Sequence, residues 1–438
     1  MVLGQVKPSP SEKKRMMATS AAIISRIENL AEERGLRVKA LLVGSAARDT
    51  WLSGAHDLDI FLAVPEDDDL GAALDLARQV APQHVEKYAE HPYVHAMMEG
   101  FEVDLVPCYL VDDASHLKSA VDRTPFHTRY VEGRIAGKED DVLLLKQFMK
   151  GVNVYGSELR VGGFSGYLAE LLVLFYGSFL CVLQQASTWR PGLVLDPEGH
   201  GTACHDEPLT VVDPVDPGRN VAAALTRDKM LLFASAARSF LASPKIDFFF
   251  PRPIAPLSDE QVEAHIAARG TMPILIEFDA PDVVEDVLFP QLRKAESSIK
   301  ALFERHGFSL LRSDVSLYRD RAVMLFEMEV WVLSSACRRM GPPVWQAEHI
   351  SRFLAAHLNP FSGPYIIDGR VAVEEARQYT TARDLLESEI TKLSMGKHLS
   401  VSICRGHNIC VGQELLSIKD EGFRLFLAKY YQARYLVG

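Results

Sequence analysis

The segments Gly44-Ser45-Ala46-Ala47-Arg48 and Asp57-Leu58-Asp59-Ile60-Phe61-Leu62 decide the fold of this chain of 438 residues. The apolar residues from Val38 to Val43 predict a strand that ends at Gly44, with a short helix over 46–52. A second strand is predicted to begin at Asp57 and to continue to residue 64. Because alternate side chains of a strand share one face, Asp57 and Asp59 project together.

A third carboxylate, Asp104, lies in the strand-like run 101–106 and can join the pair from a neighbouring strand. Three carboxylates in one place repel one another unless a cation lies between them. Oxygen ligands suit Mg²⁺, and two such ions about 4 Å apart clamp the phosphate in an in-line phosphoryl displacement. Asp57, Asp59 and Asp104 are therefore the predicted metal ligands and catalytic residues of a nucleotidyl-transfer site.

Gly44 and Ser45 occupy the predicted turn between a strand and a helix. Glycine lets the backbone approach a phosphate, and the first N–H groups of a helix attract an anion. Arg48, one turn further on, can hold a phosphate with two hydrogen bonds. A lone Gly-Ser pair would indicate an ordinary turn, so its weight comes from the acidic residues that follow.

The rest of the chain alternates between helical and strand patterns, which indicates an α+β protein of several domains with a small mixed sheet near the N-terminus. Helices are predicted over 11–33, 70–80, 164–185, 222–241 and 290–305, and helical spacing also begins at residue 138. Strands are predicted over 93–110, 209–212, 272–278, 309–317 and 322–333. Three prolines after three phenylalanines predict a domain boundary within 248–256.

The net charge of −11 is unevenly distributed, because 15 acidic and only 3 basic residues lie between 45 and 113. The remainder has 44 basic and 43 acidic residues, so basic faces for RNA remain available. The longest apolar run, 171–183, is shorter than the about 20 residues of a membrane span. Six scattered cysteines and an N-terminus without a basic-then-apolar pattern lead us to expect a cytoplasmic protein with reduced thiols.

The Gly-Ser pair, the Asp-x-Asp pair and the distal carboxylate resemble the signature of the DNA polymerase beta nucleotidyltransferase superfamily. Six further segments indicate one family within this superfamily. Together they are similar to segments of the archaeal-type (class I) CCA-adding enzymes, which are tRNA nucleotidyltransferases. These segments are Tyr88 to Val94, Asp122 to His127, Gly163 to Leu168, Val212 to Asp216, Arg219 to Ala223 and Arg338 to Pro342. The likeness extends from about residue 10 to beyond residue 380.

The resemblance implies an enzyme that adds C, C and A to the 3′ end of tRNA without a template. It would use CTP and ATP, two Mg²⁺ ions held by Asp57, Asp59 and Asp104, and release pyrophosphate. The implied nucleotide-binding residues are Gly44, Ser45, Arg48, His127, Lys146, Tyr155 and Arg219. The implied residues near the growing RNA 3′ end are Glu90, His91, Thr124, Asp213 and Asp216.

The resemblance also implies four parts: a head over 1–137, a helical neck over 138–252, an α+β body over 253–310 and 379–438, and a tail over 311–378. The body and tail would grip the acceptor stem and T-arm of tRNA, and a homodimer is compatible with the family. No DNA or membrane partner is expected. Candidate RNA contacts are Arg293, Lys294, Arg312, Arg338 and Arg339, with a helix that opens at Pro290.

Several alternatives remain open from the sequence. The same chemistry could serve a poly(A) or oligoadenylate-type polymerase, and the same fold could serve an RNA-binding protein without catalysis. Single residues have ordinary explanations as well: Lys146 as the wet face of an amphipathic helix, Tyr155 and His127 as core residues, and Arg219 as a cap of the next helix.

Overall fold

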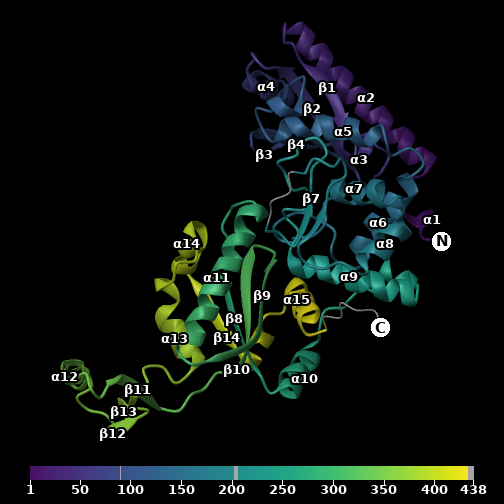
Figure 1. Cartoon of the computed structure of the whole chain (residues 1–438). Helices are drawn as coiled ribbons and strands as arrows, with labels where there is room; N and C mark the ends of the chain where they lie inside the picture. Colours follow the sequence, from purple (N-terminus) through teal and green to yellow (C-terminus); the bar gives the residue numbers. More distant parts are fainter. Residues whose placement is uncertain (89, 202–205, 433–438) are drawn as a thin grey trace. The chain divides into compact units, whose positions relative to one another are not determined.

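The computed structural model describes residues 1–88, 90–201 and 206–432. Its contacts divide the chain into two compact units, of which one runs from Met1 to Arg252 and the other begins at Pro253 (Figure 1). The division lies inside the proline-rich segment 248–256. Each unit is described by itself below. Cys204, one of the six cysteines, lies outside the described residues.

The first unit opens with a five-stranded mixed sheet in the order β1-β2-β5-β4-β3. Strands β2 and β5 are parallel, whereas the other neighbours are antiparallel. The strands are β1 (Lys39–Val43), β2 (Asp57–Pro65), β3 (Val85–Tyr88), β4 (Pro92–Met98) and β5 (Phe101–Leu110). Two helices, α2 (Pro10–Glu33) and α4 (Leu70–Val80), pack against this sheet, and Ile27 and Ile60 are fully buried in the resulting core. The predicted mixed sheet is confirmed, although β3 was missed.

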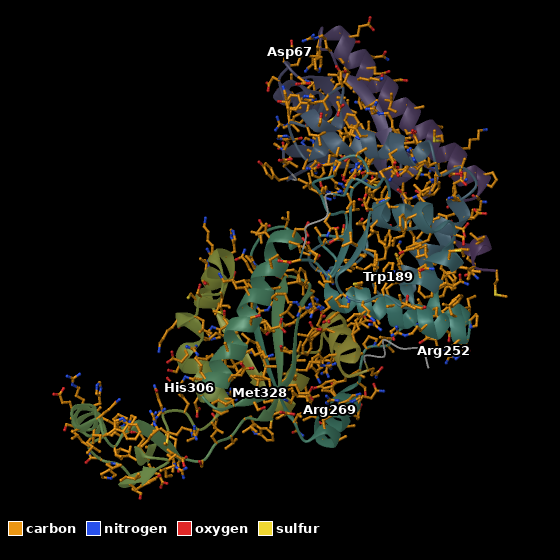
Figure 2. The ribbon with its side chains drawn as sticks, viewed as in Figure 1. Asp67, Trp189, Arg252, Arg269, His306 and Met328 are labelled. Atoms are coloured by element: carbon orange, nitrogen blue, oxygen red, sulfur yellow. The ribbon has the colours of Figure 1, made fainter. Side chains whose placement is uncertain are left out.

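A cluster of helices completes the first unit around a core rich in aromatic rings, in which Phe148 contacts five other phenylalanines. Trp189, which is labelled in Figure 2, is buried in the same core. A pair of short parallel strands lies beside it. These elements are α1 (Leu3–Val6), α3 (Gly44–Ala47), α5 (Thr124–Glu132), α6 (Glu139–Gly151), α7 (Gly166–Tyr176), α8 (Phe179–Ala186), α9 (Arg227–Ala242), β6 (Leu193–Leu195) and β7 (Leu209–Val211).

The prediction of one helix over 164–185 was wrong. The run forms α7 and α8, whose axes are bent by 93° at the break between them. Gly177 has a φ of +98°, and the Ser178 side chain accepts a hydrogen bond from the backbone N–H of Cys181, which starts a new helix. Among the described helices, none is by itself long and apolar enough to cross a membrane, although this bent pair passes the same length and composition test when taken together.

The second unit contains a four-stranded antiparallel sheet in the order β14-β8-β10-β9. Its core includes Phe303, Phe326 and Met328, and Figure 2 labels the last of these. The strands are β8 (Met272–Asp279), β9 (Ser309–Tyr318), β10 (Arg321–Val330) and β14 (His407–Val411). The helices are α10 (Asp259–Arg269), α11 (Glu285–Arg305), α13 (Ala382–Glu389), α14 (Lys397–Arg405) and α15 (Glu421–Tyr431).

A three-stranded sheet in the order β11-β13-β12 and helix α12 form a separate module within this unit. The elements are β11 (Ala336–Pro343), α12 (Ala347–Ala356), β12 (Ser362–Ile367) and β13 (Arg370–Ala376). The predicted tail began at residue 311, but the strand pairing of β9 and β10 places 309–330 in the four-stranded sheet. We call residues 336–376 the tail module.

The predicted helix that opens at Pro290 also needs correction. Helix α11 begins at Glu285, so Pro290 lies inside it and the helix has no free N-terminus beside Arg293. Pro290 has no backbone N–H, so it interrupts the hydrogen-bond ladder of α11 at one position after the first turn. Arg293 itself forms ion pairs with Glu296 and Asp314.

Candidate active site

The parallel pairing of β2 with β5 brings the three predicted metal ligands together. In its register Asp59 lies opposite Asp104, and Asp57 lies opposite Glu102. Asp57 is exposed, whereas Asp59 and Asp104 are partly buried. Two carboxylates on one face of β2 therefore meet a third from the neighbouring strand, as the alternation of side chains predicts.

The carboxylates of this cluster are partly withdrawn from water and repel one another. Burial, reinforced by Asp104 and Asp57, raises the pKa of Asp59 to about 6. Burial and the nearby carboxylates of Glu102 and Asp104 raise the pKa of Asp57 as well. Such repulsion is relieved when a divalent cation binds between the oxygens, so these residues fit a metal site.

Gly44 leaves room for this cluster. It has a φ of +71°, and a Cβ atom at this position would overlap the Asp59 carboxylate oxygen Oδ2. Gly44 is the first residue of helix α3, which ends at Ala47. The predicted turn at Gly44 and Ser45 is therefore part of the helix, and the predicted helix over 46–52 is shorter than expected. The glycine is therefore required both by its backbone conformation and by the carboxylate beside it.

His95, which the sequence reading missed, contacts the third carboxylate. It lies opposite Asp104 in the β4–β5 pairing, and its Nδ1 is 2.6 Å from the Asp104 Oδ1. Within the described residues, no three His, Cys, Asp or Glu side chains are already arranged to hold a metal ion. The carboxylates lie on neighbouring strands of one sheet, and the Asp104 carboxylate contacts the His95 imidazole.

Arg48 and Lys146 share one buried carboxylate, Glu170 of α7. The Arg48 Nη2 is 2.9 Å from Glu170 Oε2, and the Lys146 Nζ is 3.1 Å from Glu170 Oε1. Thr50 completes the network, because its hydroxyl donates to Glu170 and its carbonyl accepts from Lys146 at 2.9 Å. Burial alone would raise the pKa of Glu170, but the two cations hold it below its ordinary value.

The network changes the interpretation of Lys146. Its side chain is only 3% exposed, so the wet helix face that remained open from the sequence is wrong for this residue. The contact of Lys146 with a nucleotide stays a prediction. Arg48 has a buried Nε with no hydrogen-bond partner among the described residues, and its charge lowers the pKa of Asp59. Arg48 therefore connects the acidic cluster to the Glu170 network.

A second buried carboxylate, Asp213, joins two of the predicted nucleotide-binding residues. Its Oδ2 is 2.8 Å from the His127 Nε2 and 2.8 Å from the Arg219 Nη1. Burial alone would raise the pKa of Asp213, but the bonds with His127 and Arg219 keep it below its ordinary value. The Tyr167 ring stacks on the His127 ring at 4.2 Å between centroids, which fixes the imidazole from the other side.

The remaining predicted residues lie around these two networks. The Tyr155 hydroxyl and the Lys146 Nζ both lie against Gly166, and burial raises the pKa of Tyr155. Thr124 is the first residue of α5, the helix that also carries His127. Asp216 forms an ion pair of 2.6 Å with Arg123.

The two predicted residues just before β4 have different surroundings. Glu90 accepts a hydrogen bond from the backbone N–H of Ala120. The Nε2 of His91 is buried and has no hydrogen-bond partner within the described part of the chain. Sequence reasoning missed the carboxylate of Glu170, although a lone acid inside the apolar run Leu168-Ala169-Glu170-Leu171-Leu172 signals a buried ion pair.

Three family models match the chain in consecutive segments. The nucleotidyltransferase domain matches 24–127, the second domain of tRNA nucleotidyltransferase matches 140–250, and the C-terminal domain of CCA-adding enzyme matches 269–412. A CCA-adding enzyme of Methanosarcina mazei is 44% identical over 98% of this chain and 97% of its own length. The chain belongs to the CCA-adding enzyme family. The family is a branch of the nucleotidyltransferases, whose members use nucleotides and divalent metal ions.

Other relatives in the CCA-adding enzyme family extend the likeness across archaea. The enzyme of Methanothermobacter thermautotrophicus is 44% identical over 97% of this chain and 96% of its own length. The enzyme of Haloarcula marismortui is 38% identical over 99% of this chain and 98% of its own length. A solved structure of the Cid1 poly(U) polymerase is 15% identical, and the similarity covers 56% of this chain and 93% of that chain with a TM-score of 0.44.

Proposed function

We propose that this protein completes the 3′ ends of tRNA by adding C, C and A from CTP and ATP, with release of pyrophosphate. The observation that carries the proposal is the 44% identity to a CCA-adding enzyme over nearly the full length. The pairing of the strands that carry Asp57, Asp59 and Asp104 supports it. The protein is a tRNA nucleotidyltransferase of this family. A cytoplasmic location is part of the proposal and agrees with free cysteines at 108, 181, 337, 404 and 410.

Asp57, Asp59 and Asp104 are proposed to hold two Mg²⁺ ions. When bound, the metal ions supply Lewis-acid stabilisation for the attacking and leaving oxygens. The side chains of Arg48, His127 and Lys146 would then position the triphosphate. Their carboxylate partners Glu170 and Asp213 hold the side chains of Arg48 and His127 in place before the substrate binds, so binding costs little side-chain entropy.

Arg219 is proposed to contact the edge of the incoming base, because its guanidinium is partly exposed and anchored by Asp213. The backbone at Gly44 and Ser45 would contact the triphosphate. Lys146 and Tyr155 would line the opposite side of the nucleotide pocket. The RNA 3′ end would lie near Glu90, His91, Thr124, Asp213 and Asp216. A pocket built jointly by protein and RNA accounts for addition without a template, because the growing end itself changes the pocket between C and A.

The second unit is proposed to bind the acceptor stem and T-arm of tRNA, largely through shape and phosphates. Arg338 and Arg339 project from β11 of the tail module, where Arg339 pairs with Glu375. Arg312 is less suited to RNA, because it lies over the Tyr430 ring and donates to the Tyr430 carbonyl. The homodimer stays a prediction.

The decisive experiment supplies purified protein and Mg²⁺ with a tRNA transcript that lacks CCA. Each nucleotide is given singly, and CTP is then given with ATP, before the 3′ ends of the products are sequenced. We expect two C residues from CTP alone, and CCA followed by arrest from both nucleotides. An Asp104→Ala protein serves as the inactive control that still binds tRNA. Long A tails on any RNA would instead identify a poly(A)-type polymerase, and binding without incorporation would identify a non-catalytic protein.

A further inference from the structure

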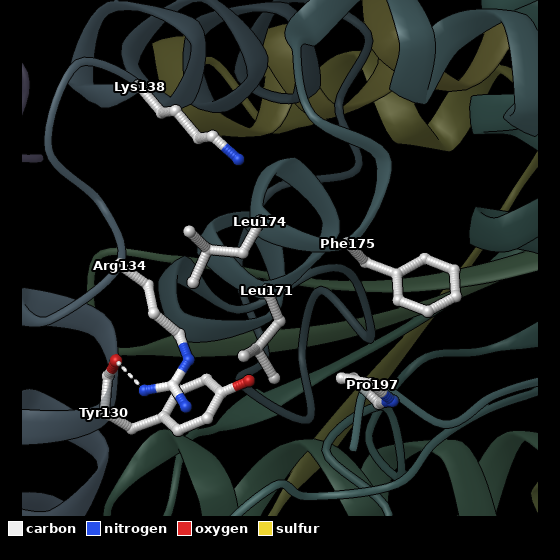
Figure 3. Close-up of a pocket in the computed structure, with 7 residues that line it drawn as sticks. All are labelled: Tyr130, Arg134, Lys138, Leu171, Leu174, Phe175 and Pro197. Carbon is white, nitrogen blue, oxygen red and sulfur yellow. Dashed lines mark hydrogen bonds between the residues drawn. The ribbon is translucent and has the colours of Figure 1, made fainter. Parts of the chain in front are cut away.

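A hollow of about 520 Å³ in the first unit lies outside the site described above. It is formed by the end of α5, the turn that leads to α6, the second half of α7 and the segment after β6. Its lining residues are Tyr130, Arg134, Lys138, Leu171, Leu174, Phe175 and Pro197 (Figure 3). This volume lies within the range of pockets that hold small molecules.

The hollow lies further along the same two helices that carry the nucleotide site. On α7, Tyr167 stacks on His127, and Leu171 and Leu174 follow at helical spacing on the same face. Seven residues of helix separate Tyr167 from Leu174, a rise of about 10 Å. The hollow is therefore close to the predicted nucleotide site, yet none of its lining residues belongs to that site.

One wall of the hollow offers a flat cation. The Arg134 guanidinium lies over the Tyr130 ring at 4.0 Å, and its Nη1 donates to the Tyr130 carbonyl. Glu198 locks the pair, because its Oε1 accepts from the Tyr130 hydroxyl at 2.6 Å and lies 3.6 Å from Arg134. A guanidinium held on one ring can stack a second planar ring on its other face.

The opposite wall offers an aromatic ring. Phe175 is 43% exposed, which is unusual for a phenylalanine, and in Figure 3 it lies across Leu171 and Leu174 from Arg134. The two leucines form an apolar floor between the walls. A ring of the size of a nucleobase can therefore contact apolar atoms below and a π surface or guanidinium at its side.

Lys138 supplies a charge at the rim. Glu198 offsets the charge of Arg134, whereas the Lys138 Nζ has no ion-pair or hydrogen-bond partner among the described residues. In Figure 3 the Lys138 and Arg134 side chains extend from the same side of the hollow. An unpaired ammonium beside an apolar floor and a stacking surface favours a ligand with one phosphate and one planar ring.

We propose that this hollow is a second nucleotide-binding subsite, in which Lys138 holds a phosphate and the base lies between Arg134 and Phe175. The nucleotide is either a unit of the bound RNA or a free nucleotide, since both present the same chemistry. The RNA source rests on the proposed function, whereas the free-nucleotide source does not.

The test compares the double variant Lys138→Ala/Phe175→Ala with the wild type, both in EDTA so that metal-dependent binding is suppressed. Binding of a tRNA transcript without CCA is followed by fluorescence anisotropy, and binding of AMP by calorimetry. A loss of about tenfold in tRNA affinity assigns the subsite to RNA, and a comparable loss in AMP affinity alone assigns it to a free nucleotide. Unchanged affinities for both ligands overturn the proposal.

The matched control is Leu180→Ala/Lys245→Ala, which removes an exposed apolar side chain and an exposed lysine elsewhere in the same unit. It should leave both affinities unchanged, and an equal loss in the control overturns the proposal. Phe175→Tyr should restore the stacking and with it the affinity. If the double variant unfolds, Lys138→Glu against Lys245→Glu provides the same comparison. CCA addition by the wild-type preparation is measured in parallel, so failure of the subsite is distinguishable from failure of the proposed function.

Discussion

Ionisation of Asp59 lowers the free energy of unfolding of the protein without bound metal. Its pKa of about 6 in the folded chain lies above the ordinary value of 3.8, so the folded state binds a proton more tightly than the unfolded state. The stabilisation that this provides is present below about pH 4 and is lost as the pH rises through about 6. Two pKa units correspond to about 3 kcal/mol, which is an upper limit for this residue.

Asp59→Asn should therefore raise the thermal unfolding midpoint in EDTA at pH 7.5, because the neutral amide avoids the burial of a charge and the repulsion from the other carboxylates. The midpoints of the variant and the wild type should converge near pH 4. Saturating Mg²⁺ should raise the midpoint of the wild type more than that of the variant. The measurement is thermal unfolding between pH 4 and 8 with and without metal. A variant that is no more stable than the wild type at pH 7.5 would contradict the assigned repulsion.

Gly44 can be tested with an unusually close control. Gly44→Ala and Gly35→Ala both place an alanine at a left-handed φ, +71° and +66°, and each should cost about 1 kcal/mol of stability. Only at position 44 does the new methyl group meet a carboxylate, since nothing lies within 4 Å at position 35. We expect Gly44→Ala to lose nearly all CCA addition and Gly35→Ala to keep it. Equal activities in the two variants would remove the proposed role of Gly44.

Glu170 offers a prediction about stability rather than chemistry. Glu170→Gln leaves Arg48 and Lys146 buried without their carboxylate, and breaking a buried ion pair in this way costs about 3 kcal/mol or more. Because the folded pKa of Glu170 is lowered, its contribution is present above the ordinary glutamate pKa and fades as the pH falls through the folded value. Urea unfolding at pH 7 and at acid pH measures both effects. Exposed Glu132→Gln is the control, and a variant as stable as this control would sink the argument.

At the scale of elements, the sequence predicted the sheet well because β2 contains a continuous apolar run and β5 alternates between apolar and polar residues. Strand β2 and helix α4 begin and end within a residue of the predicted limits, and Asp104 lies on β5 as expected. The break between α7 and α8 was missed because apolar residues continue through it, so the pattern alone does not reveal that the direction changes by 93°.

The partners of the site residues were beyond the sequence for a different physical reason. His95 meets Asp104 only through the register of β4 against β5, and Glu170 meets Arg48 only through the packing of α7. Arg48 and Glu170 lie far apart in the chain, and His95 meets Asp104 through the pairing of two neighbouring strands, so the residue pattern of a single element encodes neither contact. The placement of Asp57, Asp59 and Asp104 on paired strands was therefore predictable from the sequence, whereas the contacts around them were not.

At the scale of the whole molecule, the tail module can be removed with little disturbance to the rest. Its ends meet, because Ala336 pairs with Ala376 and the Arg377 N–H donates to the Ser335 carbonyl at 2.6 Å. In the described residues, no side chain from 336–376 belongs to the two core clusters of the second unit.

A protein in which Asn-Gly replaces 336–376 should therefore fold, since this dipeptide closes a tight hairpin turn. We expect its KM for tRNA to rise about tenfold or more, its KM for CTP to stay unchanged, and its unfolding midpoint to move by a few degrees. Steady-state kinetics and thermal unfolding provide the measurements. An unchanged KM for tRNA would argue that the tail module has no part in RNA binding.

The parallel pairing of β2 with β5 also has a consequence for the order of folding. Asp104 follows Asp59 by 45 residues, and a parallel partner is reached only after the intervening chain has crossed over. Contacts of such sequence separation are slow to form, because the loop must close before the contact stabilises it. A nascent or partly folded chain therefore has two carboxylates but not the third. With the metal ligands proposed above, metal binding would require that β5 has paired with β2, and it would therefore distinguish the folded sheet from a collapsed chain.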